Sequence, residues 1–457
     1  ERVAQQTLQR RTGQPENPTD RQRQDHPRQA YLLHDDALNL ATAAEQRIDD
    51  GCGRQPHRPD AERCQRVRAE YQAHVYTHAE IEEMIEERHR LRRRPVSLAR
   101  EDARLLAELD AAPALGPAAR EAAARAEEEL ARLEEVGLRR RPRVPRAADA
   151  VSFCSNDYLG LASRFHVDDP TGAGASRLVD GERDAHRRLE SAFAGLVGAE
   201  SALAFTSGYA ANVGTISALV SPGDLVVSDA LNHASLIDGM RLAKANVAVT
   251  PHNDLEAVER ALAARAAGSR AWVVVETYYS MDADGPDLRR LRAICDQHEA
   301  SLIVDEAHAL GVLGPEGRGR CAEAGIQPDV LIGTLGKSFG SQGAVVAGPE
   351  VLREWLWNRA RSFVFSTGLS PASAEAGRRA IEASLHSPAL RERTLRNAES
   401  LRSRLARLPN IKVLGFGHVI PIVAGARALA ISRRLADAGF DVPAIRPPTV
   451  PEGTSRL

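Results

Sequence analysis

Lys337 is the residue whose type and surroundings point most directly to chemistry. It lies in the glycine-rich segment Gly333–Gly340 (GTLGKSFG), next to the apolar run 329–333. Glycines let the backbone approach a ligand closely, and a partly desolvated lysine near a cationic cofactor has a lowered pKa. Such a lysine can act as a Schiff-base nucleophile and then as a general base. Thr334, in the same segment, can donate its hydroxyl to a phosphate.

Polar residues also follow other apolar runs of the chain. Asp305 follows Ser301–Val304 and is expected to be buried, where a protonated pyridine nitrogen would be a suitable partner for its carboxylate. The alternative role for Asp305 is a helix N-cap. The residues 207–209 (SGY) open a helix directly after a strand, so free N–H groups and the helix dipole can hold a phosphate. Further polar residues in comparable positions are Asn232, His233, Glu276, Ser280 and His308. This set suits a phosphorylated aromatic cofactor.

A nucleotide-binding protein is the rival interpretation of the same lysine. The residues 336–338 (GKS) resemble the end of a P-loop, and 302–308 (LIVDEAH) resembles an element of nucleotide-driven helicases. A P-loop needs a glycine five positions before the Gly-Lys pair, and that position is Leu331. The Asp-Glu element also precedes the lysine here, whereas in P-loop helicases it follows. The spacing therefore argues against this interpretation.

Short apolar runs alternate with stretches of helical length from about residue 150 onward. The expected strands are 202–205, 224–228, 246–249, 271–276, 300–304, 329–333 and 343–347, and the expected helices between them include 208–219, 233–243, 253–266 and 286–298. This alternation predicts an α/β fold with a mostly parallel sheet covered on both faces. Ligands of such sheets lie at the carboxyl ends of the strands, which is where the polar residues above are found.

The first 125 residues differ in kind from the rest. They are rich in Arg, Glu, Gln and Ala and contain no Phe or Trp, so they offer little to build a core. Two pieces, 79–93 and 117–136, carry Glu and Arg at helical spacing. A zinc site is a weak alternative here, because the spacing between Cys52 and Cys64 matches no common zinc module, and we predict no metal. The other residues considered for such a site are His57, His74 and His78.

Composition and charge limit the class of protein. Of 457 residues, 43% are hydrophobic and 27% are charged, which is ordinary for a globular chain. A formal net charge of -2 gives no global attraction to nucleic acid or to an anionic membrane, and the basic run 89–94 is read as a solvated cluster. No apolar run reaches bilayer length, and the five scattered cysteines form no disulfide framework. We therefore expect a cytoplasmic protein with neither a nucleic-acid nor a membrane partner.

Residues from about 127 to 457 resemble the α-oxoamine synthases, which are pyridoxal-phosphate enzymes of fold type I. The resemblance covers more than two thirds of the chain and rests on motifs in one order. These motifs are Ser155–Leu161 (SNDYLGL), Gly172–Leu178 (GAGASRL), Asn232–Ser235 (NHAS), Val304–His308 (VDEAH) and Gly333–Gly340. The resemblance implies an aspartate-aminotransferase-like large domain at 126–370 and a small C-terminal α/β domain at 371–457, preceded by an extension at 1–125.

The resemblance also implies roles for single residues. Lys337 would carry pyridoxal 5'-phosphate covalently, Asp305 would pair with the pyridine nitrogen, His308 would bind the phenolic oxygen, and His233 would stack on the ring. With Lys337, these are the catalytic candidates. The phosphate would be held by Ser207, Gly208, Tyr209 and Thr334, together with Thr367 from a second subunit, and Ser280 would complete the cofactor site. Asn156 and Glu276 would line the substrate side.

The activity implied is a decarboxylative condensation of an amino acid with an acyl-CoA. Two segments, 174–178 (GASRL) and 444–451 (AIRPPTVP), favour alanine and a pimeloyl thioester as substrates. Glycine or serine with a different acyl-CoA remains open, because pocket side chains rather than these motifs select the acyl chain. The family builds each active site from two chains, so the resemblance also implies a homodimer.

The sequence is shorter than the family pattern in three places. A hairpin is abbreviated within 139–153, a helix is missing within 163–172, and the chain ends at Leu457, just before the arginine that the family uses to bind the amino-acid carboxylate. A bidentate guanidinium is the usual partner of a carboxylate. Arg446 and Arg456 remain, and neither occupies that place in the motif; Arg446 is kept as a substrate-binding candidate. We expect an incomplete sequence, with a cofactor-binding protein that lacks activity as the alternative.

Overall fold

A computed structural model describes residues 116–140, 150–409 and 411–457. Contacts divide the chain into two units, Glu1–Ala123 and Ala124–Leu457. The helix expected at 79–93 and the cysteines and histidines considered for zinc lie outside the described residues. The helix expected at 117–136 is confirmed as α5, Pro117–Glu135.

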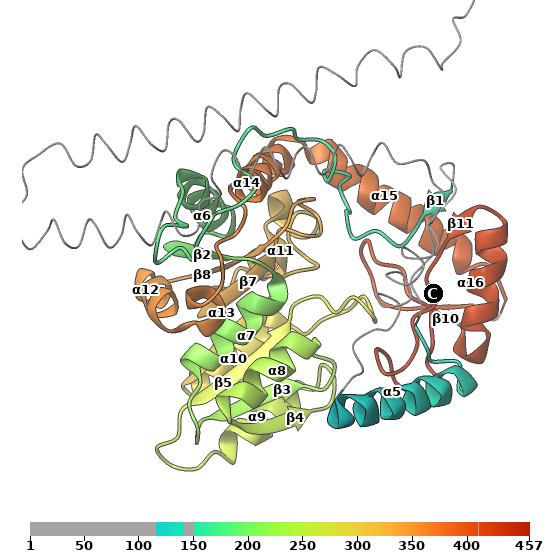
Figure 1. Cartoon of the computed structure of the whole chain (residues 1–457), viewed down its shortest axis with the longest axis horizontal. Helices are drawn as coiled ribbons and strands as arrows, with labels where there is room; N and C mark the ends of the chain where they lie inside the picture. The colour runs from blue at the N-terminus through green and yellow to red at the C-terminus, as the bar shows by residue number, and fades with distance from the viewer. Residues whose placement is uncertain (1–115, 141–149, 410) are drawn as a thin grey trace, which may run out of the picture. The chain divides into compact units, whose positions relative to one another are not determined.

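A seven-stranded sheet forms the centre of the second unit (Figure 1), in the order β2-β8-β7-β6-β5-β3-β4. Its strands are β2 Ser201–Phe205, β3 Leu225–Asp229, β4 Asn246–Thr250, β5 Ala271–Glu276, β6 Ala300–Asp305, β7 Val330–Thr334 and β8 Ala344–Gly348. Every strand expected from the apolar runs is confirmed to within one residue at each end. β8 is the one strand of this sheet that runs in the opposite direction, antiparallel to both β2 and β7. The sheet is therefore mostly parallel, as the sequence predicts.

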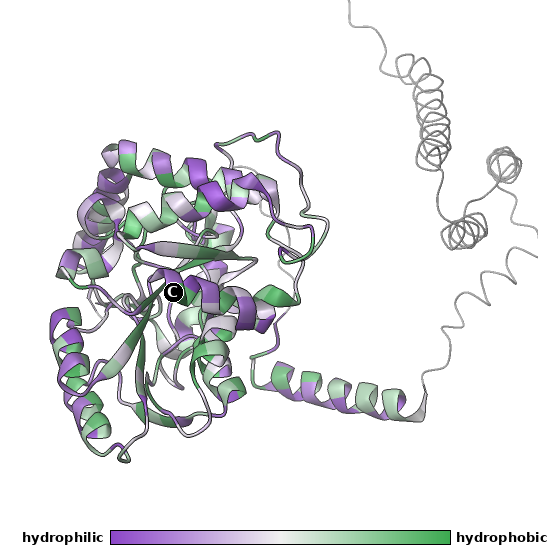
Figure 2. Ribbon diagram, turned by 90° about the vertical axis from the view of Figure 1, so that its left-hand side faces the viewer, coloured by the Kyte–Doolittle hydropathy of each residue, from purple (hydrophilic) through white to green (hydrophobic). Residues whose placement is uncertain are grey.

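Helices cover both faces of this sheet because its strands are apolar on both sides. Along β5, Val273 and Val275 belong to one buried cluster and Val274 belongs to the other. Successive strand residues point to opposite faces, so a continuous apolar run requires a layer of helices on each face. In Figure 2 the central strands are coloured mostly as hydrophobic, whereas the helices carry both colours.

Each of the two buried clusters is completed by residues from a different set of helices. Ile216 and Leu236 pack on one face, and Leu189, Leu291 and Ile381 pack on the other. The helices of this part are α6 Asp184–Val197, α7 Gly208–Leu219, α8 Ala234–Ala243, α9 Leu255–Ala263, α10 Leu288–Gln297, α11 Gly319–Ala324, α12 Glu350–Arg359, α13 Arg361–Val364 and α14 Pro371–His386, with a 3-10 turn, η2, at Pro315–Gly317. The expected helices at 208–219, 233–243, 253–266 and 286–298 are thus confirmed, with α9 shorter than expected.

The C-terminal part continues from α14 into another long helix and several short elements (Figure 1). They are α15 Pro388–Leu405, β9 Lys412–Val413, β10 Ile422–Val423, η3 Gly425–Arg427, α16 Ala428–Asp437 and β11 Phe440–Asp441. β9 and β10 pair antiparallel, and β11 pairs in parallel with β1, Val151–Ser152. The domain boundary at 371 stays a prediction. Among the described helices, none combines the length and the apolar character needed to cross a membrane.

Candidate active site

The polar residues expected at strand ends lie together at the carboxyl ends of the parallel strands. β3, β5, β6 and β7 are mutually parallel, so their carboxyl ends lie together. Glu276 at the end of β5 is in register with Asp305 at the end of β6, and Asp305 is in register with Ile332 of β7. Lys337 follows three residues after the end of β7. The sheet therefore brings two carboxylates and this lysine to a single place.

Lys337 is half-buried, and no hydrogen bond or ion pair with another described residue engages its amine. Burial lowers its pKa, while the charges of Asp305 and Glu276 oppose the change. Its turn is closed by a 2.9 Å bond from the backbone N–H of Gly340 to the Lys337 carbonyl. Gly340 has a φ of +57°, and a Cβ there would lie 2.2 Å from the backbone nitrogen of Ala162. Glycine is therefore required for this turn to pack.

Asp305 is 7% exposed, and both of its carboxylate oxygens are held. Oδ2 accepts a 2.8 Å bond from the side-chain amide of Asn212 in α7, and Oδ1 accepts a 2.8 Å bond from the N–H of Ala307. No helix begins at Asp305, because residues 307–310 form a turn, so the N-cap alternative is wrong. A buried carboxylate held in this way retains lone pairs for a cationic partner.

His233 is connected to both carboxylates by short hydrogen bonds. Its backbone N–H donates to Glu276 Oε1 over 2.8 Å, and its Nδ1 lies 2.7 Å from the Ser235 hydroxyl oxygen. That oxygen accepts a 2.9 Å bond from Asn212, which also donates to Asp305. Although His233 as a residue is exposed, desolvation of its ring lowers its pKa, and Asp305 opposes the shift. The imidazole therefore presents a neutral ring beside the lysine and the aspartate.

Glu276 and His308 are held in unusual protonation states. Burial and then the charge of Asp305 raise the pKa of Glu276 to about 8, with Lys337 opposing. Burial and then the charge of Lys337 hold the pKa of His308 well below its ordinary value. His308 Nδ1 lies 2.7 Å from the hydroxyl oxygen of Tyr158. At neutral pH the site thus holds a neutral His308 and a largely protonated Glu276.

The N-terminus of α7 brings together three of the residues expected to bind phosphate, Ser207, Gly208 and Thr334. Ser207 caps this helix by accepting a 3.1 Å bond from the N–H of Ala210. A Cβ added at Gly208 would lie 3.9 Å from Thr334 Oγ1, and one at Gly336 would lie 3.7 Å from the same atom. The two glycines therefore leave room beside the start of α7, where a helix presents N–H groups without intrahelical partners. The Thr334 hydroxyl donates to the Gly343 carbonyl over 3.2 Å, so phosphate binding by Thr334 stays a prediction.

Other predicted site residues have partners of their own. Tyr209 is 50% exposed and donates its hydroxyl to Asp238 Oδ2 over 2.7 Å. Asn156 is exposed, and its Oδ1 lies 3.2 Å from the Tyr158 hydroxyl oxygen. Thr367 is exposed, and Ser280 is half-buried. Their roles remain proposals.

The two arginines near the C-terminus are both engaged by other groups. Arg446 donates to the backbone carbonyl of Gly137. Arg456 is 4% exposed and donates to the Met281 carbonyl over 2.6 Å and to Asp282 over 2.8 Å. Substrate binding by Arg446 stays a prediction.

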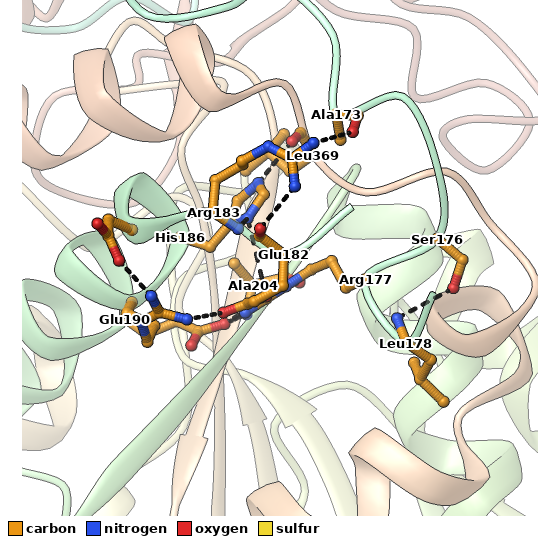
Figure 3. Close-up of polar contacts among 12 residues, drawn as sticks. Ala173, Ser176, Arg177, Leu178, Glu182, Arg183, His186, Glu190, Ala204 and Leu369 are labelled. Atoms are coloured by element: carbon orange, nitrogen blue, oxygen red, sulfur yellow. Dashed lines mark hydrogen bonds and ion pairs between the residues drawn. The ribbon is translucent and has the colours of Figure 1, made fainter. Parts of the chain in front are cut away.

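Arg177, from the Gly172–Leu178 motif, lies within a network of internal polar contacts (Figure 3). Its side chain is 1% exposed and lies 2.5 Å from both Glu182 and Glu190. The guanidinium also lies over the ring of Trp357, 5.1 Å from its centroid. A 2.9 Å bond from the Gly368 N–H to the Ala175 carbonyl then ties this loop to the segment carrying Thr367. The motif arginine is therefore an internal ion-pair partner.

Sequence reasoning missed several residues that complete this arrangement. Asn212, Ser235, Tyr158 and Arg177 support the candidates without standing at strand ends. The available signal for Asn212 was a lone amide in an otherwise apolar helix, GYAANVGTISAL. Tyr158 and Arg177 lay inside quoted motifs, with no signal for their partners.

The residues fit pyridoxal phosphate: a lysine amine with no partner among the described residues, an oriented buried carboxylate, a neutral imidazole face and a helix N-terminus beside two glycines. Together with the sheet topology, they define a pyridoxal-phosphate enzyme of fold type I. A family model for class I and II aminotransferases matches residues 148–457. The chain belongs to this family and, within it, to the α-oxoamine synthases.

Named relatives and solved structures agree with this placement. An 8-amino-7-oxononanoate synthase of Mycolicibacterium smegmatis is 45% identical, over 70% of this chain and 87% of the relative. One of Azoarcus sp. is 44% identical, over 72% and 90%. The structure of a Sphingomonas wittichii serine palmitoyltransferase matches with a TM-score of 0.65 at 30% identity, covering 67% of this chain and 81% of that chain. A Francisella tularensis 8-amino-7-oxononanoate synthase matches with a TM-score of 0.57 at 25% identity, covering 67% and 90%.

Proposed function

We propose that this protein condenses L-alanine with pimeloyl-CoA, or another pimeloyl thioester, to give 8-amino-7-oxononanoate, CoA and carbon dioxide in biotin biosynthesis. The observation that carries the proposal is the cluster of Lys337, Asp305, His233 and His308 at one sheet edge, in a chain 44–45% identical to synthases of this name. The cluster supports the cofactor chemistry, and the relatives support the choice of substrates.

Each residue has a distinct task in this proposal. When bound, pyridoxal phosphate supplies an electron sink for charge developing at Cα of the amino acid. Lys337 would hold the cofactor through its amine, and the same amine would remove the Cα proton of alanine, a role that its lowered pKa favours. Asp305 would pair with the ring nitrogen, His308 would donate to the phenolic oxygen, and His233 would cover the ring face.

The proposed reaction needs no reactant other than alanine and the thioester. The Cα carbon of alanine attacks the thioester carbonyl, and the C–S bond breaks to release CoA. The carboxylate then leaves as carbon dioxide, and the Lys337 ammonium returns its proton to the same carbon. Glu276, Asn156 and Arg446 are proposed to line the substrate side.

We further propose a cytoplasmic homodimer in which Thr367 of one chain reaches the phosphate of the other. Its exposure in the single chain supports this arrangement. Light scattering on the purified protein tests it, with a monomer as the contrary result.

Activity after deletion of residues 1–125 tests whether the extension contributes.

An assay of substrate pairs tests the activity. The chain is incubated with alanine, glycine or serine, each with pimeloyl-CoA, succinyl-CoA or palmitoyl-CoA, while thiol release and product mass are followed. Alanine with pimeloyl-CoA is expected to be the productive pair, and Lys337→Ala to reduce it to background. The match to serine palmitoyltransferase favours serine with a long acyl-CoA as the second candidate. Cofactor binding without any turnover would instead favour a non-catalytic protein.

A further inference from the structure

His418 is a buried imidazole to which the proposed activity assigns no role. It lies in the loop between β9 and β10, and neither ring nitrogen has a hydrogen-bond partner among the described residues. Burial lowers its pKa to about 4, so the ring is neutral at physiological pH. Its neighbours are aromatic: the Tyr158 ring meets it edge-on at 4.3 Å, and the Tyr278 ring stacks on it at 5.3 Å.

The loop that carries His418 is fixed by Tyr278. The Tyr278 hydroxyl donates to the Phe416 carbonyl over 2.5 Å and accepts from the Val419 N–H over 3.4 Å. These bonds fall on both sides of His418 in the sequence. The imidazole is therefore held in one position, packed against one side of the Tyr158 ring.

Tyr158 in turn reaches His308. Its hydroxyl oxygen lies 2.7 Å from His308 Nδ1 and 3.2 Å from Asn156 Oδ1. A phenol has one hydrogen to donate, so the two contacts imply alternative tautomers of His308. If Tyr158 donates to Nδ1, the ring proton is on Nε2; if it donates to Asn156, the proton is on Nδ1.

The distances favour donation to His308. A separation of 2.7 Å is the most frequent distance for an O–H donor, whereas N–H donors are most often found at about 2.9–3.0 Å. Asn156 is exposed, so water can satisfy its oxygen when Tyr158 does not. His308 would then carry its proton on Nε2, the nitrogen with no partner among the described residues.

We propose that Tyr158, held in place by the ring of His418, is a positioning residue that keeps neutral His308 in the Nε2–H tautomer. His308 is thereby prepared to donate a hydrogen bond to an anionic oxygen in the active site. The tautomer is a property of the free chain; its use toward the phenolic oxygen of the cofactor rests on the proposed function.

The test is nuclear magnetic resonance of the full chain with ¹⁵N-labelled histidine, before and after addition of pyridoxal phosphate. The ring nitrogen signals that disappear from the spectrum of His308→Gln are assigned to His308. We expect a protonated Nε2 and an unprotonated Nδ1, and a mixture of tautomers in Tyr158→Phe. Ser403→Ala is the control, because it removes an exposed hydroxyl that donates to Glu399 and has no contact with this aromatic cluster among the described residues.

Two His418 variants separate ring packing from hydrogen bonding. His418→Phe keeps an aromatic wall and is expected to preserve the tautomer, whereas His418→Ala is expected to give a mixture. Titration with pyridoxal phosphate should show about tenfold weaker binding for Tyr158→Phe, the effect of one hydrogen bond, and less than a twofold change for Ser403→Ala.

Protonation of Nδ1 in the unaltered chain, or an unchanged His308 spectrum in Tyr158→Phe, would overturn the proposal. Neither result depends on turnover, so an inactive chain with the expected spectrum would contradict only the proposed function.

Discussion

The side-chain amide of Asn212 donates a 2.8 Å hydrogen bond to one carboxylate oxygen of Asp305. These residues are 93 positions apart, and the bond joins α7, at whose N-terminus phosphate binding is expected, to the strand end that presents the carboxylate. Because the Ala307 N–H occupies the other oxygen, the direction of the carboxylate is fixed before any ligand binds.

Replacing Asn212 is expected to weaken cofactor binding. Asn212→Leu leaves a buried carboxylate oxygen without its donor, at a cost of about 1.5 kcal/mol, or roughly tenfold in the dissociation constant of pyridoxal phosphate. Absorbance titration measures that constant. Asn246→Leu, at an exposed asparagine of β4, is the control; equal weakening in both variants would argue against a specific role for Asn212.

His252 is expected to stabilise the fold in a pH-dependent way. It bridges Asp229 at 2.9 Å and Asp284 at 3.0 Å. Burial opposes its charge, but hydrogen bonds to these carboxylates outweigh it and raise the pKa of His252 to about 10. A raised pKa gives stability that is full below the unfolded value, near 6.5, and is lost as pH rises through about 10.

Urea unfolding at pH 6, 8 and 10 measures this effect. The difference between the unaltered chain and His252→Gln should be about 2 kcal/mol at pH 6 and should shrink toward pH 10. His166→Gln, at a side chain 95% exposed, is the control and should show no such trend. If the difference in the free energy of unfolding between the unaltered chain and His252→Gln stays constant with pH, the charged bridge is refuted.

Glu276 is expected to destabilise the cofactor-free chain as pH rises. Its pKa of about 8 exceeds the unfolded value, so the folded state retains a proton that the unfolded state loses between about pH 4.5 and 8. Glu276→Gln mimics the protonated form and should gain on the order of 2 kcal/mol relative to the unaltered chain between pH 5 and 9. Urea unfolding of cofactor-free protein is the measurement. Glu452→Gln, at an exposed site, should leave the pH dependence unaltered; a Glu276→Gln curve parallel to that of the unaltered chain contradicts the prediction.

Arg177 is expected to be required for folding stability. Arg177→Met leaves the nearly buried carboxylate of Glu190 without its 2.5 Å partner, and breaking a buried pair from one side typically costs about 3–5 kcal/mol. Arg187→Met is a matched control, because Arg187 also contacts Glu182 but its side chain is 58% exposed. Its cost should stay below about 1 kcal/mol in the same denaturation experiment. Similar losses in the two variants would contradict the importance of the buried pair.

The sheet could be predicted because its strands are continuous apolar runs bounded by polar residues. Once the strands are parallel, their carboxyl ends must coincide, which is why Asp305 and Lys337 could be placed together from sequence alone. The fold follows from local pattern and topology in this part of the chain.

The partners of these residues could not be predicted in the same way. Tyr158 and His308 are 150 positions apart, and their contact depends on side-chain directions that no periodicity encodes. The Tyr209 hydroxyl bonds to Asp238 because α7 packs on α8, a relation that helix length alone does not reveal. The turn after Asp305 likewise shows that a capping residue type need not begin a helix.

Borohydride reduction followed by peptide mapping tests the central claim most directly. The chain has only three lysines, and Lys244 and Lys412 are exposed whereas Lys337 is half-buried. After incubation with pyridoxal phosphate and reduction, the mass of a pyridoxyl phosphate group is expected on the peptide containing Lys337 alone. A group found only on Lys244 or Lys412, or on no peptide, would contradict the account.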